Sequence, residues 1–290
     1  MKFKGILFTI ISAIIFGFTP ILADMTYSLG NNSMSMTFYR NLFAIPFLFF
    51  ILKRKNISLK INKTEFKDIL IVSLFGVALT TVLLYSSYSY IGVGVATTLH
   101  FTFPIFVALA CRFIFNEKLC KNKIIALITS FIGILFFMEK GSSTNIIGVL
   151  MALISGVTYA FYIVYLEKKN LININSYKLS FYIVLFVSIV MFICNFFYPY
   201  IIVSLPIKAY LLMLIVSVLA SIFGVILLKV GISLIGSTSA AIFSLFEPIT
   251  SLVFGVLLLG ETLNLMKLVG SLIIFISITY LAIKSDKNNK

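Results

Sequence analysis

The chain alternates long apolar segments with short polar breaks. Each segment has about 17 to 25 residues, which is enough to cross the hydrocarbon of a bilayer as a helix. Ten such segments lie at 5–23, 34–52, 69–90, 94–115, 122–138, 146–166, 177–198, 207–229, 236–259 and 265–284. Lipid offers backbone groups no hydrogen-bond partner, and the apolar runs lack the alternation of a membrane barrel. The pattern predicts an all-α integral membrane protein with ten transmembrane helices.

The basic residues predict the orientation of these helices. The N-terminus, three alternate connections, Lys229 and the C-terminal tail hold 19 of the 23 Lys and Arg residues. The other connections hold three, and Arg40 lies inside the second segment. Since basic loops stay in the cytoplasm, both termini are expected there, in the inner (plasma) membrane of a bacterial-type cell. An even number of spans satisfies that arrangement.

The composition excludes several classes of protein. Hydrophobic residues make up 61% of the chain and charged residues 11%, against about 25% charged in soluble domains. The net charge of +14 falls between apolar segments rather than on one solvated face, so it indicates a lipid bilayer and not nucleic acid as the partner. The three cysteines form no CxxC pair and are interpreted as structural. A single histidine and no phosphate-binding glycine loop predict no metal, no cofactor and no ATP-driven pump.

The chain repeats itself. Residues 91–119 align without a gap with residues 235–263, offset by 144, with seven identities that include Pro104/Pro248 and Glu117/Glu261. At an offset of 143, Gly5 and Ser12 align with Gly148 and Ser155. We therefore expect two copies, 1–144 and 145–290, each with five spans. An odd number of spans turns the second copy upside down, which is an inverted-topology repeat.

Inverted repeats suit alternating access. Two similar halves have inward-open and outward-open arrangements of comparable energy, and the substrate site is expected near the bilayer midplane between them.

The paired Pro-to-Glu signatures, in which the two residues are separated by 13 positions, resemble the EamA branch of the drug/metabolite transporter superfamily. Thr37-Phe-Tyr-Arg40 and the residues Leu84-Tyr85 and Ile91-Gly92 are also similar to that family. The resemblance covers essentially the whole chain. It implies a ten-helix transporter or exporter of small metabolites, with a central cavity lined by spans 1, 3, 4, 6, 8 and 9, and it does not imply one substrate.

Two positions depart from the internal symmetry. Glu247 replaces the first copy's Phe103, and His100 replaces the second copy's Ser244. Glu247 lies roughly 16 Å into its span, near mid-membrane, where a carboxylate marks a functional site by default. It could bind a substrate amine or carry a coupling proton, or it could be a protonated or paired structural residue. His100 could relay protons or only hydrogen-bond a neighbouring Tyr or Ser.

Arg40 lies near the outer end of the second segment. It could attract a carboxylate, and with Glu247 it would suit a zwitterion such as an amino acid or a related amine. Alternatively, the two residues could neutralise each other, or Arg40 could extend to water and anchor its helix. The family's frequent arginine here favours the anchoring role.

Other candidates belong to the helices themselves. Pro104 and Pro248 are expected to kink their spans and share a mechanical role. Gly92 and Gly236 each begin a Gly-x-x-x-Ala pattern, interpreted as close helix packing with gating as the alternative. Glu117 and Glu261 are expected to cap or latch the turn that follows them, pairing with Lys118, Lys121 or Lys267. Five tyrosines face the expected cavity, with plain packing as the alternative: Tyr85, Tyr88, Tyr159, Tyr162 and Tyr165.

The leading hypothesis is a secondary transporter, and not an enzyme, that acts on a small molecule. A membrane-embedded enzyme would need a positioned nucleophile and base, and no such motif is present. A channel usually needs rings of carbonyls or charges built by oligomers. The direction of transport, the coupling ion and the oligomeric state stay open, with a monomer as one alternative.

Overall fold

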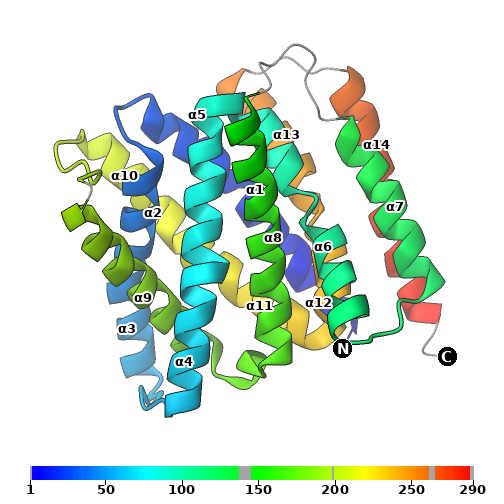
Figure 1. Cartoon of the computed structure of the whole chain (residues 1–290), viewed down its shortest axis with the longest axis horizontal. Coiled ribbons are helices and arrows are strands. Elements are labelled where there is room, and N and C mark those ends of the chain that lie inside the picture. Colours follow the sequence, from blue (N-terminus) through cyan, green and yellow to red (C-terminus); the bar gives the residue numbers. More distant parts are fainter. Residues whose placement is uncertain (1, 137–144, 198, 261–264, 288–290) are drawn as a thin grey trace.

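A computed structural model describes residues 2–136, 145–197, 199–260 and 265–287, which form the helical bundle in Figure 1. The first copy contains α1 (Lys2–Tyr27), α2 (Ser33–Leu42), α3 (Ala44–Arg54), α4 (Lys63–Ile71), η1 (Val72–Ala78), α5 (Leu79–His100), α6 (Phe103–Leu109), η2 (Ala110–Ile114) and α7 (Lys121–Leu135). The second contains α8 (Ile146–Lys168), η3 (Leu171–Asn173), α9 (Ser176–Phe197), α10 (Ile207–Val216), η4 (Ser217–Gly224), α11 (Val225–Ile235), α12 (Ser237–Phe243), α13 (Phe246–Leu259) and α14 (Leu265–Lys287).

Most of these helices are suited to a bilayer. Within the described ranges, nine stretches of 20 to 30 residues are long and apolar enough to cross a membrane. Large apolar side chains cover the outside, such as Phe113 and Phe197, which are 74% and 86% exposed. Water would penalise so much exposed apolar surface, whereas lipid does not. The all-α membrane fold is therefore confirmed. The fifth predicted span corresponds to α7, whose 15 described residues are too few to place it among these nine stretches. The total of ten crossings therefore stays a prediction.

The first span of each copy packs on the third span of the other copy, so α1 contacts α11 and α8 contacts α5. A Cβ atom added to Gly5 of α1 would lie 2.7 Å from Cβ of Leu234, and one added to Gly148 of α8 would lie 2.6 Å from Cβ of Tyr90. Gly5 aligns with Gly148, and Tyr90 aligns with Leu234. The same contact between a first and a third span therefore occurs at equivalent positions in both copies. Figure 1 shows α1 and α8 beginning at opposite ends of the bundle. The copies are thus inverted and interlocked.

Two glycines turn the chain between neighbouring helices. Gly92 has φ 74° and ψ 161°, and Gly236 has φ 79° and ψ 159°, a conformation that strongly favours glycine. Nothing lies within 4 Å of the Cβ position at Gly92, and at Gly236 the contact is Glu167 Oε1 at 3.8 Å. The predicted close packing at these glycines is therefore wrong, and their role is conformational.

The two aligned prolines begin new helices rather than kinking continuous ones. Pro104 is in the first turn of α6, after a break that follows His100, and Pro248 is the third residue of α13, after a break that follows Phe243. Amides in the first turn have no partner within the helix, so a proline there costs no hydrogen bond. The predicted interruption is present in both copies, as a break instead of a kink.

The basic connections gather at one end of the bundle. Figure 1 shows α1 starting and α14 finishing at the end where α3 leads into α4 and α8 leads towards α9. Side-chain contacts agree, because Lys2, Lys123 and Lys284 line one surface pocket and Tyr182 OH donates to the carbonyl of Leu59. We refer to this as the basic end. The asymmetry of charge along the sequence is therefore an asymmetry of the folded bundle.

Candidate functional site

A cavity of about 110 Å³ lies between the two copies. All six spans that the family resemblance implied contribute to its wall, and α2 adds Arg40. The seven residues proposed from the sequence to bind substrate all line it: Arg40, Tyr85, Tyr88, His100, Tyr159, Tyr162 and Glu247. Of its described lining residues, Arg40 and Glu247 carry the formal charges. The fold therefore brings together residues that are up to 207 positions apart in the sequence.

Glu247 enters the cavity from the first turn of α13. Its side chain is 6% exposed, and its Oε1 atom has no hydrogen-bond partner among the described residues. The backbone at Glu247 packs closely on α1, where a Cβ added to Gly17 would lie only 2.5 Å from the Glu247 carbonyl oxygen. A buried polar atom that is left unpaired costs free energy, so this oxygen calls for a polar partner. The aligned residue, Phe103, is fully buried and apolar.

Arg40 reaches the cavity wall from α2. Its Nη1 donates to the Tyr85 hydroxyl at 3.0 Å, and its Nε donates to Ser221 Oγ at 3.4 Å. Ser221 belongs to η4, a π-helical stretch that repeats η1 at the aligned place in the other copy. Arg40 is buried, so it does not extend to water as the favoured anchoring role required. The described residues include no ion pair between Arg40 and Glu247, so this conformation does not neutralise them mutually.

His100 is held by a serine of the other copy. Its Nδ1 lies 2.9 Å from Ser155 Oγ, and that hydroxyl donates to the Ala152 carbonyl at 2.6 Å. Because Ser155 donates its one proton to Ala152, we assign a neutral His100 ring the tautomer in which Nδ1–H donates to Ser155 and Nε2 is an acceptor. The hydrogen bond to a neighbouring serine is present, and a proton relay stays a prediction.

Aromatic rings form much of the wall. Tyr85 and Tyr88 have ring centroids 5.6 Å apart, and Tyr159 and Tyr162 stack at 5.9 Å. The hydroxyls of Tyr88 and Tyr162 are buried without a hydrogen-bond partner among the described residues. Tyr165 was also expected here, but it does not line the cavity because its hydroxyl donates to Asp68 Oδ1 at 2.8 Å. The wall can therefore stack a flat or apolar group and also hydrogen-bond a polar one.

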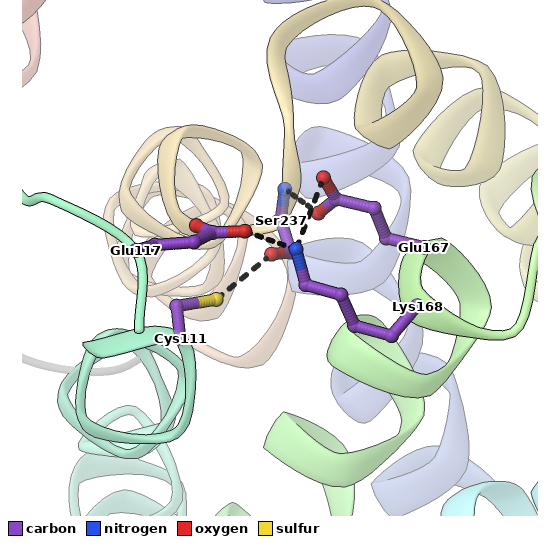
Figure 2. Close-up of polar contacts among 5 residues, drawn as sticks. All are labelled: Cys111, Glu117, Glu167, Lys168 and Ser237. Carbon is purple, nitrogen blue, oxygen red and sulfur yellow. Dashed lines mark hydrogen bonds and ion pairs between the residues drawn. The ribbon is translucent and has the colours of Figure 1, made fainter. Parts of the chain in front are cut away.

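A second polar cluster lies at the basic end (Figure 2). Glu117 forms an ion pair with Lys168, and Lys168 Nζ also lies 3.7 Å from Glu167 Oε1. The neighbouring lysines that the sequence offered to Glu117, Lys118 and Lys121, are therefore not its partners. Lys168 gave no signal in the sequence, because it is 51 residues away from Glu117. The matching expectation for Glu261 lies outside the described residues.

The sequence matches a known family of membrane proteins. The model of the EamA-like transporter family matches residues 3–138 and 146–283, one match for each copy. The chain belongs to the EamA-like transporter family. It is accordingly a multi-pass membrane protein of a transporter family.

Similar proteins agree with this membership. An uncharacterized transporter of Synechocystis sp. is 29% identical over 97% of this chain and 94% of its own. The uncharacterized transporter YcbK of Bacillus subtilis is 24% identical over 99% of this chain and 95% of its own. A solved crystal structure matches all of both chains with a TM-score of 0.82 at 11% identity, which supports the fold alone. The similarity to these transporters thus covers nearly the whole chain.

Proposed function

We propose that this EamA-like transporter is a secondary carrier that exports small zwitterionic metabolites, such as amino acids or related amines, by alternating access. The observation that carries the proposal is one cavity with two opposite charges in an aromatic wall. Glu247 presents an unpartnered carboxylate oxygen there, and Arg40 still has N–H groups beyond the two that bond Tyr85 and Ser221. A substrate ammonium and carboxylate would satisfy these two groups.

Glu247 also suits a role in coupling. A carboxylate inside a membrane protein costs several kcal/mol unless it is paired or protonated. Binding of a substrate amine and binding of a proton are therefore two alternative ways to neutralise the Glu247 carboxylate. A carrier in which the two compete exchanges substrate for proton, and that exchange would couple export to a proton gradient. The cavity is complete within one chain, so the proposal needs no second copy.

The proposed orientation places the basic end in the cytoplasm of a cell with an inner (plasma) membrane, with both termini inside. Ser28 and Ser58 are exposed in connections at opposite ends of the bundle, and each can be changed to cysteine. A membrane-impermeant maleimide should label Ser28→Cys in intact cells and spare Ser58→Cys. Cys120 and Cys194 are exposed and are replaced by serine first. The reverse labelling pattern would show that the bundle is inserted the other way.

Ligand binding tests the proposed substrate class. Purified protein is heated with an amino acid, with its amide, which lacks the carboxylate, and with its deaminated acid, which lacks the amine. Because a ligand that binds the folded state raises the melting temperature, the zwitterion should stabilise most and the two truncated compounds less. Nucleobases and sugars complete the screen. Stabilisation by a sugar or nucleobase alone would contradict the zwitterion proposal.

Flux in proteoliposomes separates a carrier from the rival classes. A carrier shows uptake that saturates with substrate and accelerates when unlabelled substrate is loaded inside. A channel shows no such counterflow, and an enzyme releases a chemically altered product. Saturable counterflow of an unaltered ligand is the result expected here.

A further inference from the structure

The polar cluster at the basic end connects three separate parts of the bundle. Glu117 follows η2 at the end of the fourth span, Glu167 and Lys168 close α8, and Ser237 begins α12. Glu167 Oε2 accepts the backbone N–H of Ser237 at 2.7 Å, and Cys111 Sγ lies 3.3 Å from Ser237 Oγ (Figure 2). Lys168 lies between the two carboxylates. One cation therefore links elements of both copies.

The cluster is attached to a turning point of the backbone. Ser237 directly follows Gly236, whose positive φ separates α11 from α12. Glu167 accepts a hydrogen bond from one of the first N–H groups of α12, which have no partner within the helix. Any movement of α12 away from α8 at this end has to break that bond, which the residue next to Lys168 accepts. The contact is therefore placed to resist opening here.

The opposite end of the repeat lacks the same chemistry. In the alignment of the two copies, Glu117 matches Glu261 and Glu167 matches Asp24, but Lys168 matches Met25. The acidic residues are repeated and the cation between them is not. The symmetry-related position therefore has no cation equivalent to Lys168.

We propose that Glu117, Lys168 and Glu167 form a one-sided gate that holds the basic end closed and biases the resting protein towards conformations closed there. The proposal rests on the alternating access proposed above. A symmetric scaffold gives the two access states comparable energies, and an ion pair whose cation, Lys168, is replaced by Met25 in the other copy shifts their populations. Lys168 is the positioning residue of this gate, since it touches both carboxylates and does not line the cavity.

A native thiol reports on the gate. Cys111 is fully buried beneath the ion pair, whereas Cys120 and Cys194 are exposed. In the full chain with Cys120→Ser and Cys194→Ser, the rate at which a water-soluble maleimide labels Cys111 measures opening at the basic end. Glu117→Gln and Lys168→Met should each raise that rate about threefold to tenfold, the range expected when a partly exposed, charge-assisted contact is lost.

Three further variants make the test specific. The double variant should label no faster than either single variant, because the two residues act through one contact. Lys168→Arg keeps the positive charge and should label at nearly the rate of the parent. Lys169→Met removes the neighbouring exposed lysine, which contacts the Tyr165 ring at 5.9 Å instead of the gate, and should leave the rate unchanged.

The labelling test is independent of any substrate. Unchanged labelling in both single variants, or a double variant whose rate is the product of the two single effects, would overturn the gate. If labelling rises as expected but no compound shows counterflow, the gate stands and the proposed transport function fails. If counterflow is found and labelling does not rise, the function stands and the gate fails.

Discussion

The two helix breaks share one backbone design and differ in their chemistry. At the first break, His100 bonds Ser155 and Phe103 is packed with no exposed surface. At the second, neither Ser244 Oγ nor Glu247 Oε1 has a hydrogen-bond partner among the described residues. In both copies a helix restarts after the break with a proline in its first turn. The first break is thus satisfied internally, and the second presents polar atoms that are not.

The backbone of the breaks is shared by the two copies, whereas the side chains at the breaks differ. Duplication supplies two matched breaks, and matched backbones are what two access states of similar energy require. A substrate without two-fold symmetry needs different groups on the two sides of the cavity. The copies can therefore keep the same backbone while their side chains diverge at the proposed substrate site.

The largest expected effect comes from removing the charge at the second break. Glu247→Gln keeps the size of the side chain but can no longer exchange a proton or balance an ammonium group. We expect proton-coupled transport in proteoliposomes to be abolished while the protein stays folded, since the amide avoids the cost of a buried carboxylate. The melting temperature should equal or exceed that of the parent.

The matched control is Glu65→Gln. Glu65 is a partly buried carboxylate that takes part in the capping box of α4, away from the cavity. Its transport rate should be unchanged. A Glu247→Gln protein that carries substrate at the normal rate with unchanged pH dependence would remove Glu247 from both proposed roles, and the two breaks would then differ only in packing.

The two breaks also differ in how closely the neighbouring helix approaches. An added Cβ would lie 2.5 Å from the Glu247 carbonyl oxygen at Gly17, and 3.0 Å from the His100 carbonyl oxygen at Gly156. Gly17→Ala forces the backbone of α13 away from α1, so it should lower the free energy of unfolding by about 1–3 kcal/mol. Gly156→Ala should cost less, because a shift of a few tenths of an ångström relieves it.

Thermal unfolding of the two variants in the same detergent checks this order. Equal losses, or a larger loss for Gly156→Ala, would show that the breaks are equally tight. The asymmetry would then be confined to the side chains.

Much of this arrangement could be predicted from one sequence. The repeat, its inversion and the helix interruptions follow from patterns that recur at a fixed offset, since Pro104 and Pro248 limit which backbones are allowed. Glu247 and Arg40 could be selected because ionisable residues within apolar segments are costly. Composition and periodicity were sufficient for these, because they report how each residue relates to lipid.

The missed features depend on three-dimensional contact. Lys168 was one of many basic residues in the sequence, and its meeting with Glu117 follows from how α8 packs on the fourth span. Gly17 is a single glycine in an apolar run, which carries no signal by itself. Gly92 fits a helix-packing motif, and the positive φ that explains it is visible in the backbone and not in the motif.

The smallest expected effect is the difference between two serine variants, and it concerns the first break. Ser155→Ala removes the acceptor of His100 Nδ1–H and leaves that donor buried and unpaired, which costs about 1–3 kcal/mol. The aligned serine provides the matched control, because Ser12 Oγ donates to the Gly224 carbonyl at 2.8 Å and Ser12→Ala leaves a single carbonyl without that bond. A carbonyl oxygen has a second lone pair and tolerates the loss more easily. Ser155→Ala should therefore melt at a lower temperature than Ser12→Ala in one detergent. Equal melting temperatures would show that His100 finds another acceptor in the cavity, and the first break would then be no more self-contained than the second.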